Sequence, residues 1–268
     1  MRDIADWFRY KLLKKIRKKH ARIAAAVVRA GLRLRSRLGM GAGREFVTSH
    51  YGVQMKANWN DRTFQYCYFG TYGGTLANLV RRYDRPFVFL DIGANQGLYS
   101  LVAARNPLCR LAVALEPVAA TFAVLQQNVA HNGFQHRVMC VQAALSDHVG
   151  TADISVQATH SGTATLARGS NFDPDSVQTV DLIDCRALDE HVPPGLDIVV
   201  KVDVEGYEEV AIAELLRSRH VARLAAVFYE VDSRWSQARS LRAMLAAAGF
   251  GNFVRHGFGR HYDILATR

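Results

Sequence analysis

The stretch Phe89 to Ser100, FLDIGANQGLYS, decides the fold of this 268-residue chain. A short apolar run ends there in a glycine-rich turn, which leads directly into a helical pattern. Because glycine has no Cβ, the backbone at Gly93 and Gly97 can adopt a positive φ and pass close to a bound small molecule. Glu116 ends the next apolar run, LAVALEP, about 20 residues later, where a carboxylate can accept hydrogen bonds from ribose hydroxyls. Together these features predict a nucleotide-like cofactor.

The glycine turn lacks two common nucleotide fingerprints. It has no Lys-Ser or Lys-Thr pair, which a phosphate-binding loop requires, so ATP hydrolysis is disfavoured. It also lacks the full GxGxxG spacing of a dinucleotide site, which argues against an NAD-dependent oxidoreductase. Asp91 stands just before the turn, and its carboxylate suits a cationic amino-acid group or a bridging water better than a pyrophosphate.

Apolar runs and helical patterns alternate along residues 86–268, which we expect to form the main domain. Strands are predicted at 87–92, 112–116, 138–144, 198–203, 225–231 and 262–266, and helices at 99–105, 119–132, 208–218 and 236–248. Such alternation predicts an α/β fold with a mainly parallel sheet and helices on both faces. Residues 151–192 depart from this pattern and predict a β-rich insertion beside the ligand crevice. Residues 44–85 are expected to form a hairpin that turns at Gly52, then one or two helices that cover the site.

The net charge of +10 is concentrated at the N-terminus. Residues 1–43 contain 13 lysines and arginines against two aspartates, whereas the remainder is close to neutral. A fold-wide nucleic-acid face would spread Lys and Arg through the domain, so nucleic acid is not the expected partner. Four separated cysteines, without a CxxC pair or a histidine cluster, argue against a disulfide framework or structural zinc and favour the cytoplasm. The charged start predicts no signal peptide, and no apolar run reaches membrane-spanning length.

A helical pattern from Ile4 to about Leu38 forms a basic amphipathic extension that stops at a group of glycines. Its aromatic residues and lysines suit an anionic membrane surface or a membrane-bound partner, which would place the protein peripherally at the inner membrane face. It could equally pack on its own domain or join the subunits of an oligomer. Its charge could also bind the phosphates of a nucleic acid. The sequence leaves these three interpretations open.

The string KVDVEGYE at residues 201–208 is the most distinctive in the chain. Alternation along a strand directs Lys201, Asp203 and Glu205 to one side, and a charged row on a buried strand is costly unless its members are paired or functional. Glu230, in FYEV, closes the next predicted strand at a comparable place. These carboxylates could converge on one crevice as a base, as hydroxyl-orienting acceptors or as ligands of a hard cation. The structural alternative is a Lys201–Asp203 ion pair that only fixes the strand end.

Residues 86–267 resemble the FkbM-type O-methyltransferases, which use S-adenosylmethionine. The strings that carry the resemblance stand in the family's order: FLDIGANQGLYS, ALEP, AALSD, SGTATL, KVDVEGYE and FYEV. The resemblance implies a class I methyltransferase fold, a Rossmann-like and mostly parallel seven-stranded sheet whose last strand runs antiparallel. It also implies methyl transfer to a hydroxyl, often on a sugar or a secondary metabolite. Residues 1–43 lie outside the resemblance.

Carried over residue by residue, the resemblance predicts a cofactor site. Asp91 just before the turn, and Gly93, Asn95 and Gly97 within it, would hold the methionine part of S-adenosylmethionine. Glu116 would bind the ribose, and Ser146 and Asp147 would lie near the adenine. Asp203 would face the methyl sulfonium.

The identity of the catalytic base stays open at this stage. An alcohol is a poor nucleophile at neutral pH, so a base must take its proton during the attack. The fourth strand is followed by D-x-E-G rather than by the N/D-P-P-Y/F loop that grips an amine, so its carboxylates are available to accept a proton. The candidate bases are Asp203, Glu205, Glu230 and His160. His256 and His261 are expected at the surface, and no metal is predicted.

The leading hypothesis is an S-adenosylmethionine-dependent O-methyltransferase that acts on a hydroxyl of a small molecule, a glycan or a glycolipid precursor. Two alternatives stay open. An RNA methyltransferase would hold phosphates with the basic extension, and its binding would weaken steeply with salt. A methyltransferase-like scaffold without activity would use the N-terminal helix for assembly. The intact set of Asp91, Glu116 and Asp203 favours an enzyme.

Overall fold

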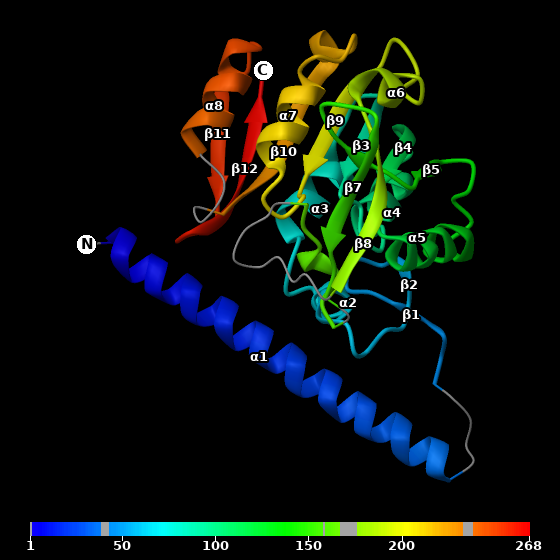
Figure 1. Ribbon diagram of the computed structural model, residues 1–268. Helices are drawn as coiled ribbons and strands as arrows, with labels where there is room; N and C mark the ends of the chain where they lie inside the picture. Colours follow the sequence, from blue (N-terminus) through cyan, green and yellow to red (C-terminus); the bar gives the residue numbers. More distant parts are fainter. Residues whose placement is uncertain (1, 39–42, 158, 167–175, 233–237) are drawn as a thin grey trace.

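The central sheet of the computed structural model has seven strands, in the spatial order β11-β12-β10-β9-β3-β4-β5. Residues 2–38, 43–157, 159–166, 176–232 and 238–268 are described. The strands are β3 (Phe87–Ile92), β4 (Cys109–Leu115), β5 (Val138–Val141), β9 (Asp197–Val202), β10 (Leu224–Asp232), β11 (Asn252–His256) and β12 (His261–Thr267). Strands β10, β9, β3, β4 and β5 pair in parallel, and β12 is antiparallel to both its neighbours. The predicted mainly parallel sheet with an antiparallel last strand is confirmed (Figure 1).

Helices cover both faces of this sheet because each buried strand presents apolar side chains to both sides. Phe87 and Phe89 of β3 belong to a core shared with α3 (Gly74–Arg82), α4 (Leu98–Arg105) and α5 (Ala119–His131). Val88 and Leu90 belong to a second core, shared with α7 (Glu208–Leu215) and α8 (Ala238–Ala247). The α/β architecture with two helical layers therefore agrees with the expectation from the sequence.

One strand prediction needs correction, and one strand is not predicted. The run predicted as one strand at 138–144 is divided, because β5 ends at Val141 and β6 (Ala144–Leu145) pairs with β8 (Val177–Ile183) in a separate sheet. That small sheet also contains β7 (Gly150–Ser155), and it occupies the predicted β-rich insertion, which closes with the short helix α6 (Cys185–Asp189). The residue pattern does not predict β11, because its side chains are exposed or half-buried at the sheet edge and form no apolar run.

The segment before the main domain forms a small hairpin and two helices. Strands β1 (Phe46–Thr48) and β2 (Gln54–Lys56) pair antiparallel, and α2 (Arg62–Tyr68) precedes α3. The hairpin is attached to α5, where the Asn128 carboxamide oxygen accepts from the Lys56 backbone N–H at 2.7 Å. The Asp61 carboxylate caps α2 by accepting from the Thr63 backbone N–H.

Residues Arg2–Arg37 form one long helix, α1, which runs below the rest of the molecule in Figure 1. Ala21 and Ala25 of α1 are buried, and α1 contacts α2. The Arg22 guanidinium donates to the Tyr66 hydroxyl at 3.2 Å. The basic extension thus packs on its own domain through one face. Among the described residues, no helix is both long enough and apolar enough to cross a bilayer.

Candidate active site

The carboxyl ends of β3, β4, β9 and β10 line a cavity of about 420 Å³, which is a typical size for a small-molecule site. Ligands of open α/β sheets bind beyond these strand ends. The β3–α4 turn forms one wall, and φ is positive at Gly93, Asn95 and Gly97. Position 93 requires glycine, because a Cβ there would collide with the carbonyl oxygen of Asp203. The turn and the end of β9 are therefore pressed together at the cavity.

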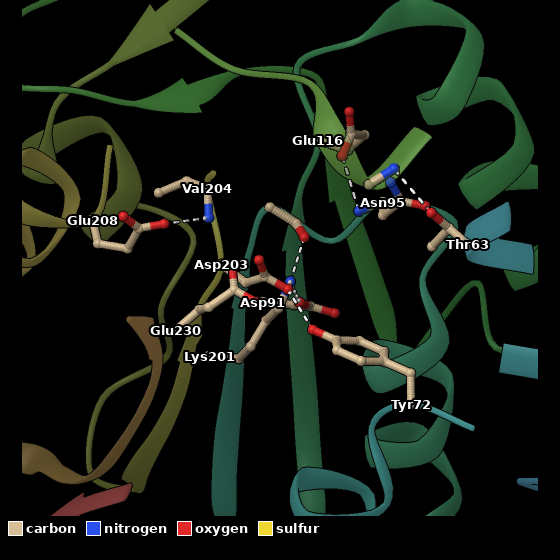
Figure 2. Close-up of polar contacts among 12 residues, drawn as sticks. Thr63, Tyr72, Asp91, Asn95, Glu116, Lys201, Asp203, Val204, Glu208 and Glu230 are labelled. Carbon is tan, nitrogen blue, oxygen red and sulfur yellow. Dashed lines mark hydrogen bonds and ion pairs between the residues drawn. The ribbon is translucent and has the colours of Figure 1, made fainter. Parts of the chain in front are cut away.

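Glu116 lies at the end of β4 and holds the turn in place. One oxygen of its carboxylate accepts from the Asn95 backbone N–H at 2.9 Å (Figure 2). The other oxygen accepts from the Val118 N–H at 3.0 Å. Burial raises the pKa of Glu116 to about 7. Since a carboxylate offers about four acceptor positions, two remain for the hydroxyls of a ribose. The side chain lines the cavity, where that predicted role is sterically open.

Asp91 supports the turn from behind and is not among the residues that line the cavity. It is fully buried, and its carboxylate accepts from the backbone N–H and the hydroxyl of Ser100 at 3.1 and 2.6 Å. The Lys201 ammonium lies 3.4 Å from Asp91 and 3.7 Å from Asp203, and it donates to the Gly93 carbonyl. Burial alone would lower the pKa of Lys201, but these two carboxylates outweigh it and raise the pKa. Lys201 thus links the turn to the acidic end of the cavity.

The predicted adenine end is mainly apolar. Ala143, Ala144 and Leu145 line the cavity there. Ser146 is buried, and its hydroxyl lies 3.0 Å from the Tyr207 hydroxyl. Asp147 is exposed beside His148 and does not line the cavity, so any contact with the adenine would come from its backbone or its neighbours.

Three carboxylates gather at the end of β9 and β10, as the sequence predicts. Asp203, Glu205 and Glu230, here called the acid cluster, each place one oxygen within 4.8 Å of the others, and all line the cavity. The Tyr72 hydroxyl donates to Asp203 at 3.0 Å, a contact between distant segments that the sequence pattern does not indicate (Figure 2). Oxygen atoms at this spacing could also bind a divalent cation. The expectation from the sequence that no metal binds here therefore stays a prediction.

Crowding changes the ionisation of the acid cluster. Burial, reinforced by the charges of Glu230 and Asp203, raises the pKa of Glu205. Burial and the charge of Asp203 also raise the pKa of Glu230, while a hydrogen bond from His261 partly offsets this rise. Two like charges at short range disfavour each other's ionised form. At neutral pH the acid cluster therefore retains a proton that isolated carboxylates would lose.

His261 is exposed, as the sequence predicts, but it also belongs to this site, which the sequence does not indicate. Its Nε2 lies 2.8 Å from the Glu230 carboxylate and its Nδ1 lies 3.5 Å from Asp232, and the side chain lines the cavity. The antiparallel register of β10 and β12 places His261 directly opposite Asp232. The contact between His261 and Glu230 cannot be predicted from the sequence pattern, because His261 follows Glu230 by 31 positions and only the strand pairing brings them together.

His160 lines a different part of the cavity. Its ring packs edge-on against Tyr66, and burial lowers its pKa. Lys18 and Arg22 of α1 line the same wall, with the Lys18 ammonium 4.8 Å from the centre of the Tyr66 ring. Burial, reinforced by the nearby cations, thus favours the neutral form of His160, and within the described residues its ring packs on Tyr66 rather than on the acid cluster.

A further carboxylate, Asp61, was given no role by the sequence. It is buried and accepts from the Ser161 backbone N–H and hydroxyl at 3.1 and 2.8 Å. It also accepts from the side-chain amide of Gln96, while the other amide atom of Gln96, Oε1, is buried and has no hydrogen-bond partner among the residues that the structure describes. Asp61 therefore joins α2, the insertion and the glycine turn. The Oε1 atom of Gln96, which lines the cavity, stays available as a hydrogen-bond acceptor.

A match to a family model identifies the family of this chain, and this match agrees with the geometry of the site. The description "Methyltransferase FkbM domain" fits residues 91–251, more than half of the chain. The chain belongs to the FkbM methyltransferase family. It is thus an S-adenosylmethionine-dependent methyltransferase by family, and the matched region holds the glycine turn, Glu116 and the acid cluster. No curated protein matches the sequence.

Several solved structures are similar to the chain at low sequence identity. The methyltransferase domain of METTL16 is 14% identical, with a TM-score of 0.49, and the match covers 81% of this chain and 74% of that one. A precorrin-6y C5,15-methyltransferase from Geobacter metallireducens is 16% identical, with a TM-score of 0.41 over 72% and 87% of the two chains. TrmK of M. capricolum, solved with S-adenosylhomocysteine, is 12% identical, with a TM-score of 0.40 over 73% and 67%.

The residues around the cavity fit the cofactor of this family. Glu116 keeps acceptor positions for two ribose hydroxyls. Ala144 and Leu145 offer an apolar surface to a flat base. Beside the turn, the orphaned Oε1 of Gln96 can accept from a donor such as the amino group of the methionine part. All of these residues line one continuous cavity that also reaches the acid cluster.

Proposed function

We propose that this methyltransferase transfers the methyl group of S-adenosylmethionine to a hydroxyl, on a sugar of a glycan, a glycolipid or a secondary metabolite. The observation that supports a hydroxyl acceptor is the acid cluster, which shares the cavity with the glycine turn and Glu116. An amine acceptor needs no strong base once it is neutral, whereas an alcohol must lose its proton as it attacks. A group of carboxylates with raised pKa values suits that task.

Glu230 is the base that the ionisation of the acid cluster favours. A general base works best when its pKa is close to the working pH, and the pKa of Glu230 is raised toward that range. Glu205 holds its proton more strongly because of its burial and its acidic neighbours, so it acts as a hydrogen-bond donor. Asp203 is bound by Tyr72 and Lys201, which fix it beside the turn.

The residues divide the reaction between them. The cofactor, when bound, supplies an electrophilic methyl group. Asp203 and Tyr72 orient the acceptor hydroxyl, and the Glu230 carboxylate takes its proton. His261, 2.8 Å from that carboxylate, stabilises its ionised form and can pass the proton on to solvent, because its side chain is 45% exposed. Positioning at attack distance then provides the remaining part of the rate enhancement.

The wall built by α1 and α2 favours a sugar that carries an anionic group. Tyr66 offers an aromatic ring, while Lys18 and Arg22 offer two cations at the same cavity. Arg22 suits phosphate or carboxylate because its guanidinium presents several donors in one plane. The acid cluster would repel the same group and so turn the hydroxyl, rather than the anion, toward Glu230.

The first test is calorimetric titration with S-adenosylhomocysteine. Wild-type protein should bind it, and Glu116→Gln should weaken binding by about 1–3 kcal/mol, because one acceptor of a buried hydrogen-bond set becomes a donor. Glu190→Gln, at an exposed glutamate that does not line the cavity, is the matched control and should bind as wild type does. Absence of binding to folded wild-type protein would instead favour the scaffold hypothesis.

The second part of the test identifies the acceptor chemistry. Methyl-labelled S-adenosylmethionine is offered with nucleotide sugars, lipid-linked glycans and total RNA. Label that resists mild alkali is expected on the sugar-containing acceptors, because a methyl ether survives conditions that cleave a methyl ester. Alkali-labile label would point to a carboxyl acceptor, and label confined to RNA would support the RNA methyltransferase alternative.

A further inference from the structure

Helix α1 is attached to the domain by a narrow face of small residues. Ala21 and Ala25 are 2% and 0% exposed, and they allow the helix to approach α2 closely. Longer side chains on the same side reach the domain, where Arg22 donates to Tyr66 at 3.2 Å and Arg29 donates to the Trp59 carbonyl at 2.6 Å. This contact fixes which face of α1 is turned away from the protein.

The opposite face carries an uncovered row of large apolar side chains, here called the outer stripe. Its members are between 36% and 67% exposed: Leu12, Ile16, Ile23, Val27, Leu34 and Leu38. They recur as three pairs with an 11-residue repeat. At 3.6 residues per turn such a repeat keeps them within an arc of about 80°, roughly 160° away from the buried alanines. Packing on the domain therefore leaves the outer stripe uncovered within the described chain.

Basic residues border the outer stripe on both sides. On a regular helix Lys19 and Arg37 lie directly beside one edge, and Arg17 and Arg35 lie about 60° beyond the other edge; all four are exposed. No aspartate or glutamate occurs between residues 7 and 43. Apolar side chains at the centre of a cationic face are typical of helices that lie in the interface of an anionic bilayer.

We propose that α1 is an interfacial helix whose outer stripe lies on an anionic membrane surface. Charge decides between this occupant and a second copy of the chain. Pairing two outer stripes would bring the basic borders of both helices together with no acidic residue to balance them, and like charges at such a contact are destabilising. Lipid phosphates supply the complementary charge, and acyl chains cover the apolar centre. A nucleic acid would leave that centre exposed.

A membrane-bound α1 would also position the cavity. The inner face of α1 contributes Lys18 and Arg22 to the cavity wall, so a helix lying on the bilayer would hold this wall at the membrane surface. The bilayer contact itself is independent of the reaction, and it would stand even if the acceptor were not a hydroxyl.

Vesicle sedimentation with full-length protein tests the inference. Wild type should sediment with vesicles of phosphatidylglycerol and phosphatidylcholine, and should stay in solution with phosphatidylcholine alone. Val27→Glu, in the middle of the outer stripe, should lower the partition coefficient at least about tenfold, because a charge replaces an apolar group at the interface. Val149→Glu is the matched control, since both valines are 67% exposed, and it should sediment as wild type does.

Other outcomes would overturn the proposal. Equal loss of binding in Val27→Glu and Val149→Glu, or no binding of wild type to anionic vesicles, would exclude the outer stripe as a membrane contact. Light scattering that shows a dimer which Val27→Glu dissociates, without vesicle binding, would assign the stripe to a second copy. S-adenosylhomocysteine titration of each variant confirms that the fold is intact, and it separates failure of the membrane contact from failure of the proposed reaction.

Discussion

The two ends of the cavity are built in opposite ways. At the glycine turn two carboxylates are held by hydrogen bonds: Glu116 accepts from two backbone N–H groups, and Asp91 accepts twice from Ser100. At the acid cluster, carboxylates crowd together, and burial raises the pKa values of Glu205 and Glu230. Hydrogen-bonded carboxylates give the turn a fixed shape, whereas crowded carboxylates with raised pKa values can exchange a proton near neutral pH. The first suits binding of a cofactor and the second suits acid–base chemistry.

The largest expected effect separates these two ends directly. Glu230→Gln should lower kcat by roughly 10²- to 10⁴-fold, because the amide cannot take the acceptor's proton. S-adenosylhomocysteine affinity should be unchanged, since the turn is intact. A variant with wild-type kcat in the methyl-transfer assay would remove Glu230 from the mechanism and leave Asp203 as the base.

The same substitution should not destabilise the protein at high pH. The folded-state pKa of Glu230 is raised above its unfolded value, so its ionisation costs stability as pH rises through that interval. The amide that replaces this carboxylate carries no charge and avoids the cost. In denaturant unfolding, the free energy of unfolding of Glu230→Gln relative to that of wild type should therefore be more favourable at pH 8 than at pH 4. A variant that is more strongly destabilised at pH 8 than at pH 4 would contradict the crowding of charge in the acid cluster.

At the other end, Gly93→Ala should disrupt the shape of the turn. Its Cβ would collide with the Asp203 carbonyl at a φ of +77°, which adds steric overlap to an unfavourable backbone conformation. Gly195→Ala has nearly the same φ, +79°, but open space around the new Cβ. We expect Gly195→Ala to cost about 1–2 kcal/mol in the free energy of unfolding and Gly93→Ala distinctly more, with loss of S-adenosylhomocysteine binding. Equal costs would show that the turn can move away from β9.

The smallest effect concerns the pH dependence of the reaction. His261 lowers the pKa of Glu230 through its hydrogen bond and charge, so His261→Asn should raise that pKa further. Because the base must be ionised, the acid limb of the kcat profile should move to higher pH, with less change at alkaline pH. A profile that keeps its midpoint but drops uniformly would assign His261 a structural role.

The sequence by itself determined those features that depend on neighbours along the chain. The turn at Gly93, the carboxylate of Glu116 one strand later and the row of Lys201, Asp203 and Glu205 each lie within or next to one strand–turn–helix unit. Strand and helix alternation, which follows from hydrophobic period, was also enough for the parallel sheet. This alternation does not predict β6 or β11 as separate strands, because β6 is only two residues long and the side chains of β11 are exposed or half-buried, so neither shows a clear hydrophobic period.

Only the tertiary structure decided which distant groups meet. His261 reaches Glu230 through the register of β10 and β12, Tyr72 reaches Asp203 across 131 residues, and Asp61 joins the glycine turn through Gln96. The packing of α1 likewise buries its alanine face against the domain and leaves the outer stripe exposed. The sequence predicts only an amphipathic helix and does not indicate which face contacts the domain. Such contacts depend on strand order and on the approach of whole elements, which local periodicity does not encode.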